Sequence, residues 1–320
     1  MTTISEPVKP PAPQERRTRK TLVLAGGGAK AVWQVGACEH LIGERGYWFD
    51  IIASISAGAV NGTALAQAHD PAELKVELEH LRSVWFGVRG NHDIYESGRL
   101  GPLGFLLGRQ IGVYGNAPLR RVLLEHIDPR RVAASPVELR IGYVDLLSGR
   151  YRTARNDHPA LVDAVLASCA LPLVFPAVPL SDGQELGVDG GVRYIIPLFD
   201  VLSVLAERPP ADGGDEIWIL DSNVPDEIPR ARHCHWLTVA RRCLSLVTNS
   251  AFVEGIEQTR GVIDLLRSSA NPDGRRDIAL HVLQPRQELS GSLLDFDPAK
   301  LRRWYMDGVR TARQGETLRV

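Results

Sequence analysis

The stretch TLVLAGGGAKA, residues 21–31, decides the fold of this chain. Residues 21–25 are an apolar run without polar alternation, which predicts a strand buried on both faces of a sheet. Three glycines, at positions 26–28, end the strand, and residues 29–44 then have the pattern of a helix closed by Gly46. A buried strand, a tight turn and a helix in this order predict a parallel sheet covered by helices.

The same order of elements follows directly in the chain. Residues 51–54 predict a second buried strand, which ends in a tight turn around Ser56, and residues 57–68 predict a helix of small residues. Pro71 then opens an amphipathic helix that is expected to end near residue 84. We therefore expect an α/β fold with a mostly parallel central sheet.

The remaining sequence continues this pattern without a repeat or an interdomain linker. The expected elements are a hairpin of strands at 139–144 and 150–154, helices at 158–168, 235–267 and 298–313, and strands at 216–221 and 278–283. Residues 1–19 are rich in proline and polar residues and are expected to be a disordered leader. Residues 20–320 are expected to form a single α/β domain.

Composition excludes several classes of protein. The 320 residues contain 37 Lys and Arg against 38 Asp and Glu, so the chain lacks the basic excess of a generic nucleic-acid binder. No run of eighteen apolar residues could span a membrane, and no apolar segment near the start predicts a signal peptide. Four cysteines without CxxC spacing favour reduced, buried thiols. A protein in the cytoplasm or at the periphery of a membrane is expected.

The turn Ser54-Ile55-Ser56-Ala57-Gly58 lies between a predicted strand and a predicted helix. It resembles the nucleophile elbow G-x-S-x-G, which needs small residues on both sides of the serine because the backbone folds back on itself. The following helix directs its N-terminal amides toward Ser56. Ser56 is therefore a candidate nucleophile, with a helix N-cap as the alternative role.

The glycine turn has three possible roles: a simple turn, a dinucleotide-binding loop, or an oxyanion hole. The dinucleotide interpretation requires an acidic residue at the end of the second strand, but Asp50 precedes that strand. Neighbouring parallel strands end at one edge of a sheet, so the glycine turn and the Ser56 elbow can share a site there. This favours the oxyanion hole.

A base for the serine is not provided by a recognisable histidine motif. His281 lies in an apolar predicted strand and is expected to be a core residue, while the segment His233-Cys234-His235 has no second cluster of metal-ligand spacing. No metal or other cofactor is expected. Asp189, at the end of a short apolar stretch and before Gly190 and Gly191, is either the base or part of an Asp-Gly turn.

The glycine turn, the serine elbow and the Asp-Gly-Gly segment, in this order, resemble the patatin-like phospholipase family. Residues 167–176, ASCALPLVFP, look like that family's A-S-x-x-x-P-x-x-F segment. The resemblance covers about residues 20–200. It implies a three-layer α/β/α fold and a Ser–Asp dyad.

The resemblance also implies a role for each matching position. Ser56 would be the nucleophile and Asp189 its general-base partner. The backbone amides of residues 27–29 (Gly27, Gly28 and Ala29) would form the oxyanion hole, with Gly26 shaping the loop. Lys30 matches a basic residue of the family loop and would either contact substrate or extend into solvent. Gly58, Gly190 and Gly191 would support the motifs.

Two positions depart from the family pattern. Ala31 and Ser54 stand where the family has glycine, and both are small enough for the geometry to survive. The implied activity is that of a serine lipid acyl hydrolase of the phospholipase A or lysophospholipase type. The alternatives are an acyltransferase that uses the same acyl-enzyme and a catalytically impaired lipid-binding module. The oligomeric state is left open.

Two further segments bear on the lipid substrate. Residues 87–115 are rich in glycine and apolar residues, including Phe105, Leu106 and Leu107, and are either a lid over an acyl-chain entrance or an ordinary loop. The leader together with Lys20 contains five Lys and Arg against two Glu. Such a segment is expected to attract anionic membrane surfaces weakly.

Overall fold

The computed structural model describes residues 17–97, 112–223, 261 and 277–315. Three sequence-based expectations therefore lie outside the described residues: most of the leader, the centre of the glycine-rich insertion with Phe105, Leu106 and Leu107, and nearly all of the helix at 235–267. The His233-Cys234-His235 segment lies outside them as well.

The described residues form one large sheet in the order β10-β9-β1-β2-β5-β8-β7, with β6 paired to β5. Its strands are β1 Arg19–Leu24, β2 Ile51–Ile55, β5 Glu138–Asp145, β6 Arg150–Arg155, β7 Val178–Leu180, β8 Glu185–Asp189, β9 Asp215–Leu220 and β10 Ile278–Leu283. The five strands from β10 to β5 are mutually parallel, whereas β6 and β8 run antiparallel to β5. The expected mostly parallel sheet is confirmed.

Helices follow the strands in the expected alternation. They are α1 Val32–Cys38, α2 Ala57–Leu65, α3 Pro71–Gly87, α5 Ala117–His126, α6 Pro129–Ala134, α7 Leu161–Ser168, α8 Leu198–Glu207 and α10 Pro298–Gln314, with short turns η1 Gly28–Ala31, η2 Glu39–Glu44, η3 Asn91–Asp93, η4 Ser181–Gly183 and η5 Gly190–Val192. A small separate sheet pairs β3 Glu96–Ser97 with β4 Tyr114–Gly115. Because η1, α1 and η2 are continuous, the helix expected at 29–44 is present.

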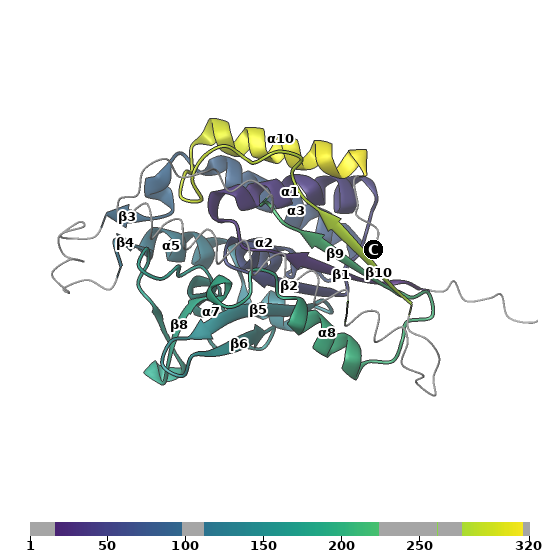
Figure 1. Ribbon diagram of the computed structural model, residues 1–320, viewed down its shortest axis with the longest axis horizontal. Helices are drawn as coiled ribbons and strands as arrows, with labels where there is room; N and C mark the ends of the chain where they lie inside the picture. Colours follow the sequence, from purple (N-terminus) through teal and green to yellow (C-terminus); the bar gives the residue numbers. More distant parts are fainter. Residues whose placement is uncertain (1–16, 98–111, 224–260, 262–276, 316–320) are drawn as a thin grey trace, which may run out of the picture.

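Side chains of the central strands alternate between two apolar cores, one on each face of the sheet. Leu22 and Leu24 of β1 belong to the larger core, which contains α1, α2, α3, α7 and α10. Val23 of the same strand belongs to the smaller core, which contains α8. Figure 1 shows α1, α3 and α10 on one side of the sheet and α8 on the other. The expected three-layer α/β/α fold is confirmed.

Helices α1 and α10 pack at very short distance. A methyl group on Gly36 would lie 2.0 Å from the Tyr305 carbonyl oxygen, and one on Gly308 would lie 2.1 Å from the Trp33 carbonyl oxygen. Only glycine therefore permits this approach. The contact fixes α1, and with it the glycine turn that leads into α1, against a helix from the far end of the chain.

Several elements differ from the sequence-based expectation. Strand β1 begins at Arg19, two residues before the apolar run, because Arg19 forms an ion pair with Asp215 at the start of β9. α6 and β7 have only six and three residues, which is too short to give a periodic pattern. α5 and α8 are also absent from the expected elements. Across the described ranges, no helix is both long and apolar enough to cross a bilayer.

Candidate active site

Ser56 lies in the sharp turn between β2 and α2, at the carboxyl edge of the parallel sheet. Its backbone has φ 56° and ψ −134°, a conformation that costs about 1–3 kcal/mol for a non-glycine residue. Gly58 makes the turn possible, since a methyl group there would lie 2.5 Å from the Leu24 carbonyl oxygen. The geometry matches the elbow that the sequence predicts, and Ser56 makes no side-chain cap to the helix.

Asp189, the last residue of β8, lies directly beside Ser56. Ser56 Oγ donates a hydrogen bond of 2.7 Å to Asp189 Oδ2, and the Gly191 amide donates one of 2.8 Å to Oδ1. Only 4% of Asp189 is exposed. Burial raises the pKa of this carboxyl to about 6, although the two hydrogen bonds act in the opposite direction. The structure thus brings together two residues that are 133 positions apart.

Both glycines after Asp189 permit close approach. A methyl group on Gly190 would lie 2.7 Å from the Gly142 carbonyl oxygen on β5, and one on Gly191 would lie 3.0 Å from Asp189 Oδ1. The close approach is therefore to a strand and to the carboxylate. It aims the Asp189 side chain at Ser56.

The glycine turn after β1 borders the same pair of side chains. A methyl group on Gly26 would lie 3.2 Å from Ser56 Cβ, so the loop backbone and the serine are in contact. Gly28 has φ +54°, and a methyl group there would lie 2.2 Å from the Leu293 carbonyl oxygen. The turn is held between the elbow on one side and the 289–296 segment on the other.

The backbone amides of this turn divide into paired and unpaired donors. Gly26 donates to the Ile195 carbonyl at 3.3 Å, and Ala29 donates to the Leu293 carbonyl at 2.7 Å. Within the described ranges, the amides of Gly27 and Gly28 donate to no other group. The resemblance had suggested Gly27, Gly28 and Ala29 as donors, but the Ala29 amide is already occupied because η1 packs against Leu293.

Lys30 is buried rather than extended into solvent. Its exposed fraction is 7%, and its Nζ atom lies 3.8 Å from Glu288 Oε1. Burial lowers the pKa of the lysine, while Glu288 acts to raise it. The expectation of a solvated first-turn side chain is therefore wrong. The alternative, contact with substrate, stays a prediction.

Both departures from the family pattern are accommodated in the core. Ala31 and Ser54 have no exposed surface. Asn61 Nδ2 donates to the Ala31 carbonyl at 3.0 Å, and Ser54 Oγ donates to the Arg140 carbonyl at 3.4 Å. Gly62, one turn into α2, leaves the space that the Ser54 side chain occupies.

The segment 167–176 also reaches the site, at the end of α7. Ser168 Oγ accepts a hydrogen bond from the Ser56 amide at 2.8 Å, and the Asp189 amide donates to the Ala170 carbonyl at 2.9 Å. The sequence predicts no role for this segment beyond its match to the family. The sequence feature that could have indicated its position is the pair of small residues, Ala167 and Ser168, before a turn.

No histidine of the described ranges is hydrogen-bonded to Ser56 or Asp189. His281 is 6% exposed and stacks on Trp218 with ring centroids 4.0 Å apart, as expected for a core histidine. Among the described residues, no group of three His, Cys, Asp or Glu side chains is arranged to hold a metal ion. Asp50 accepts a hydrogen bond from the Lys20 amide at the opposite, amino edge of the sheet.

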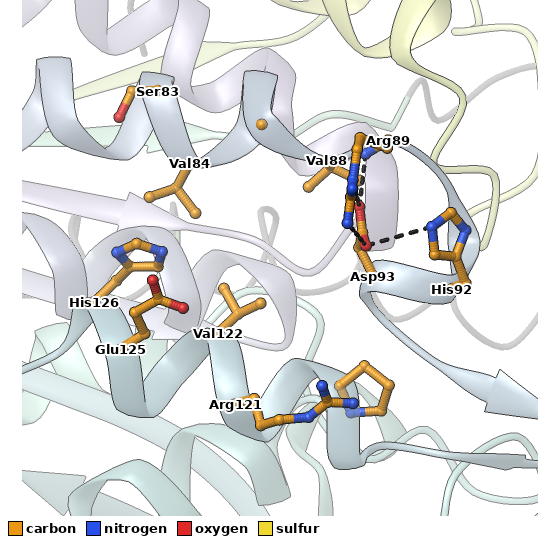
Figure 2. Close-up of a pocket in the computed structure, with 12 residues that line it drawn as sticks. Ser83, Val84, Val88, Arg89, His92, Asp93, Arg121, Val122, Glu125 and His126 are labelled. Carbon is orange, nitrogen blue, oxygen red and sulfur yellow. Dashed lines mark hydrogen bonds and ion pairs between the residues drawn. The ribbon is translucent and has the colours of Figure 1, made fainter.

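A separate hollow of about 520 Å³ lies between the end of α3, η3 and α5 (Figure 2). Its charged lining includes Arg121, Glu125 and an Arg89–Asp93 ion pair. Its lining contains none of the residues that the sequence predicts for the site.

Fold and site together define an α/β protein with a serine elbow, a glycine loop and a buried carboxylate at one edge of a parallel sheet. Residues 22–202 match the family described as patatin-like phospholipase, and the chain belongs to this family. Family membership supports a lipid hydrolase activity.

The solved structures to which the chain is similar include VipD from Legionella pneumophila, with 14% identity, a TM-score of 0.42 and 93% of this chain covered. The type III effector protein ExoU has 14% identity, a TM-score of 0.37 and the same coverage of this chain. The chain spans 66% of the VipD structure and 52% of the ExoU structure. No curated protein matches the chain.

Proposed function

We propose that the chain is a serine lipid acyl hydrolase of the phospholipase A or lysophospholipase type that uses Ser56 and Asp189 as a catalytic dyad. The observation that carries the proposal is the 2.7 Å hydrogen bond from Ser56 Oγ to Asp189 Oδ2 in a buried site. Because burial raises the pKa of Asp189 to about 6, this carboxylate is a stronger base than an aspartate in water.

In the first stage, Asp189 takes the hydroxyl proton while Ser56 Oγ attacks the carbonyl carbon of a fatty-acyl ester. The negative charge that develops on the carbonyl oxygen is stabilised by backbone N–H groups, and the candidates are the amides of Gly27 and Gly28, which have no acceptor among the described residues. The tetrahedral intermediate collapses to an acyl-enzyme when the leaving alcohol accepts the proton from Asp189.

In the second stage, water replaces the alcohol. Asp189 removes a proton from water, the resulting hydroxide attacks the acyl carbon, and the proton returns to Ser56 Oγ as the fatty acid leaves. Both stages use the same two atoms, Ser56 Oγ and Asp189 Oδ2. Burial of Asp189 favours proton uptake by its carboxylate, and the N-terminus of α2 lies beside Ser56, where it favours negative charge. An alcohol in place of water would give acyl transfer by the same route.

A labelling experiment tests this function. Wild type, Ser56→Ala and Ser181→Ala are treated with a fluorophosphonate probe and assayed on phosphatidylcholine, lysophosphatidylcholine and a neutral glyceride, with and without added alcohol. Ser181 is the matched control, since it shares a positive φ of 50° but is exposed and lies on η4. Labelling that Ser56→Ala alone abolishes supports the dyad. A folded wild type that neither labels nor hydrolyses any lipid contradicts it.

We also propose that residues 20–320 act as one domain and that the leader contributes to membrane attraction. β1 pairs with β9, and α10 packs on α1, which supports a single unit. Residues 1–16 contain Lys9 and Arg16 against Glu6 and Glu15, so deleting them would remove no net charge. The test therefore replaces Lys9 and Arg16 by alanine and leaves Arg19, which belongs to β1 and pairs with Asp215. We expect the variant to have lower activity than wild type on anionic vesicles and unchanged activity on a soluble ester. Wild-type activity of the variant on anionic vesicles would contradict the membrane role.

A further inference from the structure

The hydroxyl of Ser168, the last residue of α7, joins two backbone groups of the sheet edge. Ser168 Oγ accepts from the Ser56 amide at 2.8 Å and donates to the Gly142 carbonyl of β5 at 2.6 Å. The residue has no exposed surface. One hydroxyl has a single proton, so both of its roles are used: donor to β5 and acceptor from the nucleophile's own residue.

This bridge lies where direct pairing between β2 and β5 stops. Ile55 is the last residue of β2 in register with β5, opposite Gly142. The next residue, Ser56, turns out of the sheet with φ 56°, so its amide can no longer continue the ladder. The Ser168 hydroxyl lies between that amide and the Gly142 carbonyl, and it thereby replaces a direct backbone hydrogen bond between the two segments.

The carbonyl of Ser56 is held from the same helix end. Cys169 Sγ donates to the Ser56 carbonyl at 3.1 Å, and the Ala59 amide donates to it at 2.8 Å. Burial raises the pKa of the Cys169 thiol well above its usual range, which keeps the sulfur protonated as a donor. Both polar backbone groups of Ser56 are therefore bound by consecutive residues, Ser168 at the end of α7 and Cys169 directly after it.

The segment also contacts the second member of the proposed dyad. The Asp189 amide donates to the Ala170 carbonyl at 2.9 Å. The Gly142 carbonyl that Ser168 binds is the atom against which Gly190 packs. Residues 168–170 thus touch the backbones of both Ser56 and Asp189, from one rigid helix end.

We propose that Ser168 is a positioning residue for catalysis: its bridge between the Ser56 amide and the Gly142 carbonyl sets the direction of Ser56 Oγ toward Asp189 Oδ2. This role rests on the dyad function proposed above. It has a second consequence, since a Ser56 amide bound to Ser168 is not a donor to the oxyanion. The hydroxyl is required because no aliphatic side chain can accept from one backbone group and donate to another.

The test compares Ser168→Ala with Ser135→Ala. Ser135 is a matched control, because its Oγ also donates to a carbonyl, that of Ala68, and accepts from a backbone amide, that of Val137, away from the dyad. Ser168→Thr keeps the hydroxyl, and Ser168→Cys replaces Ser168→Ala if the latter does not fold. The measurements are kcat and KM on a soluble ester, fluorophosphonate labelling rate, melting temperature, and hydrogen exchange of the Ser56 amide.

We expect Ser168→Ala to lower kcat and the labelling rate about 10- to 100-fold with KM within twofold, because a small misplacement of a reacting group has effects of this size. The Ser56 amide should exchange faster, Ser168→Thr should recover part of kcat, and Ser135→Ala should keep kcat within twofold. This pattern supports the proposal. A folded Ser168→Ala with wild-type kcat, or equal losses in both alanine variants, overturns it.

Hydrogen exchange separates this proposal from the function on which it rests. If wild type is not labelled at Ser56, the dyad function fails, and the exchange rate alone then decides about the bridge. Faster exchange at Ser56 in Ser168→Ala but not in Ser135→Ala keeps the backbone role. Unchanged exchange overturns it.

Discussion

Carboxylates at the two edges of the parallel sheet have different partners: cations at the amino edge and neutral hydrogen-bond donors at the carboxyl edge. At the amino edge, Arg19 and Asp215 form an ion pair at 2.6 Å, Lys20 and Glu216 form one at 3.4 Å, and Arg17 pairs with Asp50. At the carboxyl edge, Asp189 and Asp221 are buried. Within the described residues, they accept hydrogen bonds from neutral hydroxyl and amide groups.

The difference lies in what surrounds each charge. Burial without a cation raises the pKa of both Asp189 and Asp221 to about 6, whereas a nearby guanidinium would favour the ionised form. The paired carboxylates link strand ends, whereas Asp189 and Asp221 have a raised affinity for protons. The carboxyl edge therefore holds the carboxylate that is suited to the proposed acid–base chemistry, and burial destabilises its charged form.

The strongest test of this contrast replaces one aspartate at each edge. Asp189→Asn should lower kcat about 10²- to 10⁴-fold on a soluble ester, because an amide cannot take the Ser56 proton. Asp215→Asn should leave kcat within twofold and lower the melting temperature, since it removes the partner of Arg19. Steady-state kinetics and thermal unfolding of both variants check this. Similar kcat values in the two variants would refute the division of roles.

A slightly smaller effect is expected from the glycine turn. Gly28→Ala should lower kcat about 10²- to 10³-fold, because the new methyl group would meet the Leu293 carbonyl oxygen and displace the Gly27 and Gly28 amides that are proposed as oxyanion donors. Gly149→Ala is the control: Gly149 has φ +66° but no atom within 4 Å of the added methyl group. It should lose stability and keep kcat. Equal losses of kcat would assign the effect to backbone strain alone.

The stability of the carboxyl edge should depend on pH in a defined direction. The pKa of Asp189 rises from 3.8 to about 6 on folding, so between these values the folded state binds a proton that the unfolded chain releases. Stability from this group therefore falls as pH rises from about 4 to 6. At pH 7, Asp189→Asn should be more stable than wild type by up to about 3 kcal/mol, and at pH 4 the difference should vanish.

Chemical unfolding at both pH values checks this prediction. Asp215→Asn, at the other edge, should be less stable than wild type at pH 7. A wild type more stable than Asp189→Asn at pH 7 would show that the buried carboxylate is not a source of instability.

The smallest expected effect is the acidic limb of the rate profile. Below pH 6, kcat/KM should fall about tenfold per pH unit, because protonated Asp189 cannot act as a base. Asp221 has a similarly raised pKa, so Asp221→Asn is the control and should keep the limb. If the acidic fall in kcat/KM disappears in Asp221→Asn, the titrating group is Asp221 and not Asp189.

The part of the fold that could be predicted from sequence is the part encoded locally. Buried runs such as residues 51–54 and the glycine and serine turns predict β1, β2 and their helices because each pattern is contained within about fifteen residues. The pairing of β1 with β9, and the placement of β8 beside β5, depend on contacts over long separations and leave no local pattern.

The candidate site divides in the same way. Ser56 is indicated by its elbow, whereas Asp189 could be selected from other Asp-Gly turns only through the family resemblance. The occupied Ala29 amide and the buried Lys30 could not be predicted, because both depend on residues 288–293 folding back over η1. The bridge made by Ser168 depends on α7 ending beside β2 and β5.

The pairing of β1 with β9 has a consequence for how the protein is made. Arg19 at the start of β1 bonds to Asp215, 196 residues later, and α1 packs on a helix that begins at Pro298. Contacts over such separations form slowly and late. During synthesis, the contacts that fix the glycine turn beside the serine elbow can therefore form only after β9 and α10 have emerged, long after the elbow itself has been made.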